Sequence, residues 1–165
     1  MENVYLVGFM GTGKTTVARL LAENLGRRFV EMDSEIEKSA GMSIVEVFEV
    51  KGQDHFRDLE SNLLADIAKQ SDLVVSCGGG IVCRQENIDL LKKSGKLINL
   101  SASADVIYKR LKDDNSRPLL KVADPLNEIA RLLEIRQPFY GQADITISTD
   151  DLSPEAVTKE ILKVL

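Results

Sequence analysis

Short apolar runs alternate along this chain with longer segments in which apolar residues recur every three or four positions. The run Val4–Val7 precedes a segment where Val17, Leu21 and Leu25 recur at helical spacing. Runs of the first kind predict β-strands at Val4–Val7, Phe29–Glu31, Leu73–Ser76, Lys96–Leu100 and Ile145–Ser148. Periodic segments predict helices at Lys14–Leu25, Ser34–Ala40, Ile44–Lys51, Asp54–Gln70, Gln85–Lys93, Ala104–Asp113, Asn127–Tyr140 and Pro154–Val164. Strands that alternate with helices predict an α/β fold with a parallel sheet.

Two segments depart from a simple strand and helix alternation. Residues 34–71 are long and entirely helical by pattern, which indicates an inserted substrate-binding unit rather than one crossover. Residues 113–124 are polar, contain proline and lie between predicted helices, as expected of a lid over a nucleotide. We therefore expect one domain, residues 1–165, with a substrate-binding region at about 32–71 and a lid at about 113–124.

The composition is that of an ordinary globular protein, with 44% hydrophobic and 28% charged residues. A net charge of -5 argues against general affinity for nucleic acid or for anionic membranes. The N-terminus lacks the features of a signal peptide, and no apolar run reaches the roughly 18 residues that span a bilayer. We therefore expect a cytoplasmic protein that binds anions locally and, without an obvious exposed apolar stripe, acts as a monomer.

Residues 8–15 spell G-x-x-x-x-G-K-[ST] directly after the first predicted strand. This spacing predicts a phosphate-binding loop, in which backbone N–H groups and the start of a helix surround an anion. Lys14 then supplies a charge to the β- and γ-phosphates of a nucleotide, and the Thr15 hydroxyl is placed to ligate Mg²⁺.

Two further chemical groups follow the second and third predicted strands, at the edge of the sheet where ligands of parallel sheets bind. Asp33 is a candidate to orient or deprotonate an acceptor hydroxyl, or else it caps the next helix. The run Gly78–Gly80 either lets a ligand touch the main chain or forms a plain turn.

Several arginines are candidates for binding anions. Arg57 lies one turn before Glu60, so the pair is either a surface ion pair or a guanidinium locked for a bidentate grip on a carboxylate. Arginines near the predicted lid are expected to neutralise transferring phosphate, although one or two are expected to be mere surface charge: Arg110, Arg117, Arg131 and Arg136.

The chain has two cysteines, Cys77 and Cys83, and a single histidine, His55. These do not assemble a zinc site or a Cys-His pair. We interpret both cysteines as small buried hydrophobic residues.

A set of short motifs occurs in one order along nearly the whole chain: the phosphate loop, Asp33, Phe56-Arg57 with Glu60, Gly78-Gly80, Arg117-Pro118-Leu119-Leu120 and Arg136-x-Pro-x-Tyr140. In this joint order and spacing the chain resembles the shikimate kinase family. The resemblance implies a P-loop NTPase fold of the nucleoside-monophosphate-kinase-like type. That fold is a three-layer sandwich with a five-stranded parallel sheet, a helical substrate-binding insertion and a lid.

The resemblance also implies a reaction and the residues that carry it. The reaction is transfer of the γ-phosphate of ATP to the 3-hydroxyl of shikimate, in the pathway to chorismate and the aromatic amino acids. The implied catalytic residues are Lys14, Asp33 and Arg117. Shikimate is bound by Asp33, Arg57, Gly78, Gly79, Gly80 and Arg136, with the two arginines on its carboxylate. ATP is bound by Gly11, Thr12, Gly13, Lys14, Thr15, Thr16, Arg110 and Arg117.

The chain departs from the family pattern in the acidic residues near the metal. The family usually has D-x-D after the second strand, whereas this chain has Glu31-Met32-Asp33. The third strand ends in Ser76 where other P-loop proteins carry a Walker-B carboxylate, so Glu31 joins Thr15 as the expected partner of Mg²⁺. The family's G-E before the F-R pair reads Gly52-Gln53, a change with little expected effect.

Two alternatives to shikimate phosphorylation remain open at this level. A gluconate-type polyol kinase shares the loop and the fold, although the two-arginine clamp favours shikimate. A non-catalytic nucleotide-switch module would be expected to contain a guanine-reading N-K-x-D motif, and the sequence has none.

Overall fold

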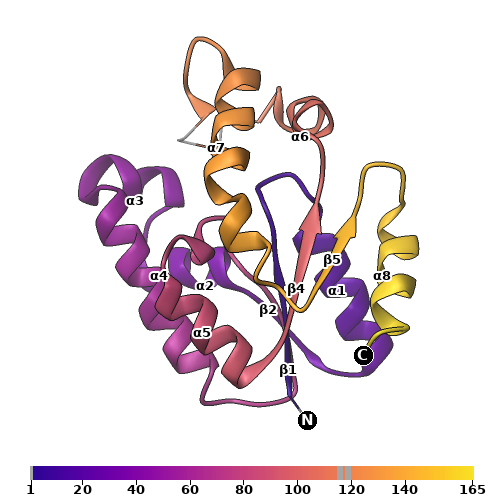
Figure 1. Cartoon of the computed structure of the whole chain (residues 1–165). Helices are drawn as coiled ribbons and strands as arrows, with labels where there is room; N and C mark the ends of the chain where they lie inside the picture. Colours follow the sequence, from indigo (N-terminus) through magenta and orange to yellow (C-terminus); the bar gives the residue numbers. More distant parts are fainter. Residues whose placement is uncertain (1, 115–116, 118–119) are drawn as a thin grey trace.

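The computed structural model describes residues 2–114, 117 and 120–165. A five-stranded sheet with every neighbouring pair parallel forms its centre, in the order β2-β3-β1-β4-β5 (Figure 1). The strands are β1 (Asn3–Val7), β2 (Arg28–Glu31), β3 (Leu73–Ser76), β4 (Gly95–Ser101) and β5 (Ile145–Ser148). The α-helices are α1 (Lys14–Leu25), α2 (Met32–Ala40), α3 (Ile44–Lys51), α4 (Gln53–Ile67), α5 (Gln85–Ser94), α6 (Ala104–Leu111), α7 (Pro125–Tyr140) and α8 (Pro154–Leu162).

Helices cover both faces of the sheet, which makes a three-layer sandwich. Side chains alternate between the faces of a strand, so Val4 and Leu6 of β1 join the core beneath α1 and α8. Tyr5 and Val7 join the larger core on the other face, which includes residues of α4, α5, α6 and α7. Because both faces are covered, β1 is buried at every position.

The helices α2, α3 and α4 form the insertion predicted between the second and third strands. They share a small core of their own, in which Ile36, Val47 and Phe56 are buried. At the start of α3, the Ser43 hydroxyl accepts from the Glu46 N–H at 3.2 Å, and the Glu46 carboxylate accepts from the Ser43 N–H at 2.7 Å. This capping box fixes the point where the chain turns into α3.

The predicted elements agree closely with the structure except at some ends. The most consequential difference is at α2, which begins at Met32 directly after β2, so that Glu31 occupies the cap position. Asp33 therefore lies in the first turn of α2, and its alternative role as a helix cap is wrong. A short 3-10 helix, η1 (Ile81–Cys83), was not predicted because three residues are too few to show a period.

The prediction that both cysteines are buried is half right. Cys77 is buried, and burial raises the pKa of its thiol. Cys83 is exposed, because η1 turns Ile81 and Val82 toward the core and leaves its last residue outside.

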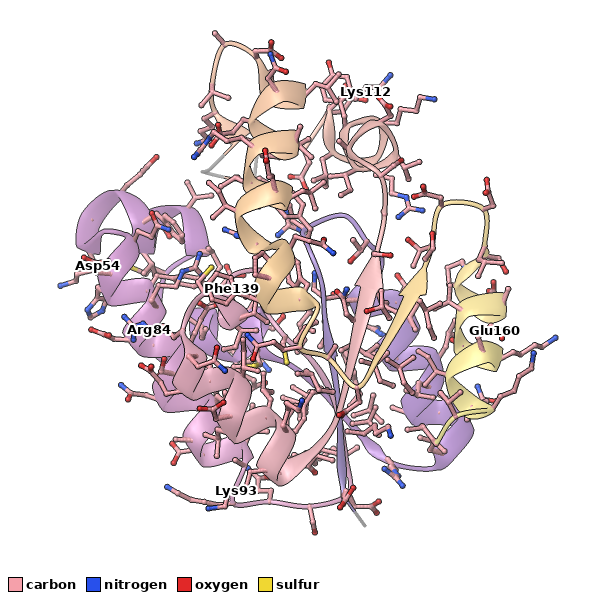
Figure 2. The ribbon with its side chains drawn as sticks, in the orientation of Figure 1. Asp54, Arg84, Lys93, Lys112, Phe139 and Glu160 are labelled. Atoms are coloured by element: carbon pink, nitrogen blue, oxygen red, sulfur yellow. The ribbon has the colours of Figure 1, made fainter. Side chains whose placement is uncertain are left out.

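The outer surfaces of the helices are charged. Figure 2 shows Glu160 on the outer side of α8 and Lys93 near the end of α5, both pointing away from the sheet. No described helix has the length and apolar character needed to cross a membrane. Part of the predicted lid, including Pro118 and Leu119 of the Arg117-Pro118-Leu119-Leu120 motif, lies outside the described residues.

Candidate active site

Two adjoining pockets lie at the carboxyl ends of β1, β2 and β3. The phosphate loop follows β1, Asp33 follows β2, and the glycine run follows β3. The helix α7 crosses above this edge of the sheet and brings Arg136 to it (Figure 1). Parallel strands place their following loops at one edge, so residues far apart in the sequence meet here.

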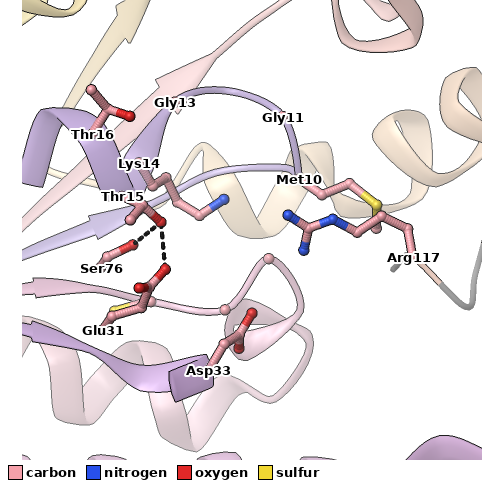
Figure 3. A pocket seen from close by; sticks show the side chains of 13 residues that line it. Met10, Gly11, Gly13, Lys14, Thr15, Thr16, Glu31, Asp33, Ser76 and Arg117 are labelled. Atoms are coloured by element: carbon pink, nitrogen blue, oxygen red, sulfur yellow. Dashed lines mark hydrogen bonds between the residues drawn. The ribbon is translucent and has the colours of Figure 1, made fainter. Parts of the chain in front are cut away.

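The first pocket, which we call the phosphate pocket, is formed by the loop between β1 and α1 (Figure 3). Gly13 has a left-handed backbone with φ 92°, and it precedes α1 without any side-chain cap. The first N–H groups of α1 are therefore left for a ligand, at the positive end of the helix dipole. Thr16, predicted to bind nucleotide, also lines this pocket.

Lys14 points into the phosphate pocket beneath its own loop (Figure 3). Its ammonium donates to the carbonyl oxygens of Gly8 at 2.8 Å and Phe9 at 2.9 Å. Burial lowers the pKa of Lys14 to about 8, and the nearby positive charge of Arg117 adds to this, while Asp33 opposes it. An anion bound in this pocket would raise the pKa again by stabilising the ammonium form.

The oxygen atoms of Thr15, Glu31 and Ser76 meet at the floor of the phosphate pocket (Figure 3). The Thr15 hydroxyl donates to Glu31 Oε1 at 2.6 Å and lies 3.4 Å from the Ser76 hydroxyl. Oxygen ligands of this kind, with a single carboxylate, fit Mg²⁺ bound together with phosphate. The Glu31 carboxylate is thus in direct contact with the threonine predicted to bind the metal.

The second pocket, which we call the acceptor pocket, combines charged groups with an apolar wall. The predicted residues Asp33, Arg57, Arg136 and Gly78–Gly80 all line it. Further lining residues, which the sequence did not single out for this pocket, are Met10, Ile44, Phe48 and Phe56. Apolar residues on helices resemble core residues in a sequence, so only their position beside the predicted charges would have indicated them.

Arg57 and Glu60 form a buried ion pair rather than a surface pair. Arg57 is 8% exposed and Glu60 1% exposed, and Arg57 Nη1 donates to Glu60 Oε2 at 2.5 Å. Burial raises the pKa of Glu60, and the guanidinium partly offsets this. A buried pair of this geometry fixes the direction of the guanidinium and leaves its remaining N–H groups for a ligand.

The glycine run forms a turn, in which the Ile81 N–H donates to the Gly78 carbonyl at 3.2 Å, and it also lies close against the Arg57 and Glu60 pair. A Cβ atom on Gly78 would lie 2.4 Å from Glu60 Oε1, and a Cβ atom on Gly80 would lie 2.2 Å from Arg57 Nη2. Any side chain at these two positions would therefore displace the ion pair. The Tyr140 hydroxyl donates to the Gly79 carbonyl at 2.6 Å and so fixes the middle of the run from α7.

Asp33 lies where the two pockets meet and lines both of them. Burial raises the pKa of its carboxyl group, while the charges of Lys14 and Arg117 oppose this rise. Its Oδ1 atom is buried and accepts no hydrogen bond from the described residues. A buried carboxylate oxygen without a donor is suited to a ligand hydroxyl.

The four arginines near the predicted lid have different positions. Arg117 lines both pockets and pairs with Asp114 at 3.6 Å, and Arg136 lines the acceptor pocket. Arg110 donates to the Gly11 carbonyl at 2.9 Å, at the outer side of the phosphate loop. Arg131 is exposed on α7 and pairs with Glu128 at 2.6 Å, so it belongs to the surface charges that the sequence anticipated.

The fold and the two pockets define a class of protein, the P-loop kinases that phosphorylate a small molecule. Comparison with known proteins identifies the family. Residues 10–165 match the family model described as shikimate kinase. A shikimate kinase of Caldicellulosiruptor saccharolyticus is 47% identical to this chain over 99% of its length and 95% of the relative. The chain belongs to the shikimate kinase family and has its ATP-dependent shikimate kinase activity.

Solved structures separate the family from its neighbours in fold. Shikimate kinase from Acinetobacter baumannii, in complex with shikimate, has a TM-score of 0.96 and 38% identity, over 99% of this chain and 92% of that chain. A gluconokinase from Sinorhizobium meliloti 1021 has a TM-score of 0.59 at 18% identity, over 98% of this chain and 90% of that one. The likeness to the gluconokinase shows a shared fold only. The family match therefore decides for shikimate kinase over the gluconate-type kinase.

Proposed function

We propose that the two pockets hold the two substrates of this activity, with ATP in the phosphate pocket and shikimate in the acceptor pocket, so that the γ-phosphate meets the 3-hydroxyl. The observation that carries the proposal is the pair of buried guanidinium groups, Arg57 and Arg136, in a pocket that opens onto the phosphate loop. Shikimate is a ring with one carboxylate and three hydroxyl groups. Two arginines are the expected partners of the carboxylate, since each offers parallel N–H donors.

Within this proposal, Asp33 holds the hydroxyl groups and faces the one that attacks. Its raised pKa suits a group that accepts a proton during the reaction, and its unpartnered oxygen is available for that hydroxyl. The main chain at Gly78, Gly79 and Gly80 forms one side of the ring's site. The apolar side chains of Phe48 and Ile44 exclude water from the ring's other side.

The phosphate loop, residues Gly11 to Thr16, binds the phosphates of ATP, and Lys14 and Arg117 stabilise the charge that develops on the transferred group. Arg110 is proposed to lie against the adenine. Mg²⁺, when bound, neutralises charge on the β- and γ-phosphates, and Thr15 and Glu31 are the proposed residues that hold it. The assignment rests on their contact on the floor of the phosphate pocket.

The experiment that tests this function is ADP release with shikimate, gluconate and nucleoside monophosphates supplied in turn. We expect a signal with shikimate only. In Arg136→Ala the KM for shikimate should rise by about 30-fold or more, because the carboxylate loses a buried partner. Circular dichroism should show that this variant is folded. Equal rates with gluconate, or an unchanged KM in Arg136→Ala, would refute the proposal.

The proposed role of Glu31 has its own test, in which binding is measured rather than turnover. Titration of Mg²⁺ into the complex with ADP should show weaker metal binding in Glu31→Gln than in Glu31→Asp, because only the latter keeps a carboxylate. Equal Mg²⁺ affinity in both variants and in the unchanged chain would remove Glu31 from the site.

We also propose that residues 1–165 act as one kinase domain and as a monomer, with residues 32–71 binding the acceptor and residues 113–124 closing over the nucleotide. Because the nucleotide substrate is a cytoplasmic metabolite, we propose that the chain works in the cytoplasm. Sedimentation of the purified chain, and fractionation of cells that produce it, test these statements. A stable dimer or a membrane-bound fraction would contradict them.

A further inference from the structure

Tyr140, the last residue of α7, connects two parts of the acceptor pocket that are far apart in the sequence. It is 3% exposed, and its hydroxyl donates to the Gly79 carbonyl at 2.6 Å. Arg136 lies four residues earlier, which places the two side chains on the same face of the helix. Pro138, between them, restricts the backbone of this last turn. The end of α7 is therefore tied to the glycine run after β3.

The Tyr140 hydroxyl also faces the Arg136 guanidinium. Burial raises the pKa of Tyr140 to about 12, while the charge and a hydrogen bond of Arg136 oppose this rise. The hydroxyl therefore stays protonated at neutral pH, and it can accept from Arg136 while it donates to Gly79. The Arg136 guanidinium lies 5.4 Å from the centre of the Phe9 ring as well. Two aromatic side chains thus hold this guanidinium, and neither of them neutralises its charge.

The position of Gly79 gives its hydrogen bond with Tyr140 a consequence for the pocket. A Cβ atom on Gly79 would lie 3.8 Å from Arg136 Nη1 and 3.3 Å from the Met10 nitrogen. The carbonyl of a trans peptide and the N–H of the same peptide point in opposite directions. Anchoring the Gly79 carbonyl therefore directs the N–H of Gly80 away from Tyr140. Gly80 lines the acceptor pocket, so the bond sets the direction of a main-chain donor there.

We propose that Tyr140 is a positioning residue for the acceptor, whose hydroxyl holds the Gly79–Gly80 peptide and the Arg136 guanidinium in one fixed arrangement. A main-chain donor and a charged donor then meet the same small carboxylic acid. The inference rests on the proposed role of Arg136 in binding shikimate. Tyr140 is not among the residues that line either pocket, so it acts through these two groups and not by touching the substrate.

The test compares Tyr140→Phe, which keeps the ring and removes the hydroxyl, with a chain that carries 4-aminophenylalanine at position 140. The amino group keeps a donor at the same place on the ring. In Tyr140→Phe the KM for shikimate should rise about 3- to 20-fold, because a buried carbonyl loses its donor and the guanidinium loses a partner. The kcat and the KM for ATP, measured by steady-state ADP release, should stay within about threefold. The amino-substituted chain should recover most of the affinity for shikimate.

The matched control is Tyr5→Phe, which removes another buried hydroxyl. The Tyr5 hydroxyl lies 2.8 Å from that of Ser94, next to the amino end of β4. Tyr5→Phe should lower the melting temperature about as much as Tyr140→Phe does and leave the KM for shikimate unchanged. If Tyr140→Phe behaves as this control does, or if the amino-substituted chain recovers no affinity, the positioning role is overturned.

A double variant tests whether Tyr140 acts through Arg136. In Arg136→Ala, adding Tyr140→Phe should raise the KM for shikimate by a smaller factor than it does alone, because the guanidinium that it holds is absent. Equal factors in the two backgrounds would overturn the link to Arg136. If Arg136→Ala itself binds shikimate normally, the proposed function has failed instead.

Discussion

The two halves of the cleft are built from different kinds of residue. The phosphate pocket is built around one continuous segment, residues 8–15, and main-chain groups at the start of α1. The acceptor pocket takes side chains from α2, α3, α4 and α7, and main chain from the glycine run after β3. Main-chain groups bind any phosphate, whereas spatially assembled side chains select one acceptor. In the proposed function, the acceptor pocket therefore selects the molecule that is phosphorylated, and the fold, which the gluconokinase shares, does not.

The largest expected effect comes from removing the charge of the phosphate half. In Lys14→Met we expect kcat to fall by about 100- to 1,000-fold, because one preorganised charge on the transferring group is lost. Shikimate binding without nucleotide should stay within about threefold, since Lys14 is not among the residues that line the acceptor pocket. Steady-state ADP release and titration of shikimate measure the two quantities. A matching loss of shikimate affinity would show that the halves are not separable.

The complementary change is Gly80→Ala in the acceptor half. The new Cβ atom would overlap the Arg57 guanidinium, so we expect the KM for shikimate to rise by about 5- to 100-fold while ADP affinity is unchanged. Gly141→Ala is the matched control, because Gly141 has an ordinary backbone with φ -64° at the end of α7. If Gly80→Ala binds shikimate normally, Arg57 does not hold the position that the structure gives it.

A smaller effect, proton uptake when nucleotide binds, is expected from the phosphate pocket. The pKa of Lys14 is lowered to about 8, and bound phosphate raises it, so the chain takes up protons when nucleotide binds between those two pKa values. We expect Lys14 to take up about half a proton per ADP at pH 8, and almost none at pH 6 where it is already charged. Calorimetry in buffers of different ionisation enthalpy measures this uptake. It should vanish in Lys14→Arg, which stays protonated, and persistence there would assign it to another group.

The smallest effect is expected at Arg131, which lies on the same helix as Arg136. Its side chain is exposed and paired with Glu128, so Arg131→Ala should change kcat and both KM values by less than about twofold. Steady-state kinetics beside Arg136→Ala provides the comparison. A large loss in Arg131→Ala would contradict the assignment of Arg131 to the surface charges.

The phosphate pocket could be predicted from the sequence in more detail than the acceptor pocket, for a physical reason. The phosphate loop is local, and the five parallel strands follow from continuous apolar runs, so both could be predicted and the fold is confirmed. The acceptor pocket depends on where helices cross. Periodicity showed that Arg57 lies on a helix but could not show whether its pair with Glu60 is buried.

The residues that the sequence analysis missed carry no charge or motif that marks them as part of a site. Met10, Ile44 and Phe48 are apolar, and nothing in their spacing separates a pocket wall from a core. The exposure of Cys83 was missed because the short helix η1 has no readable period. The resemblance to a family supplied Arg136 as a substrate residue, and the structure adds its burial and its contact with Phe9.

The measurement that tests the two-half cleft most directly is a crystal structure with shikimate and a non-hydrolysable ATP analogue bound together. We expect the shikimate carboxylate to lie within hydrogen-bond distance of both Arg57 and Arg136, with its 3-hydroxyl between Asp33 and the γ-phosphate. A ternary complex in which the carboxylate touches neither arginine, or in which the 3-hydroxyl faces away from the nucleotide, would contradict the account.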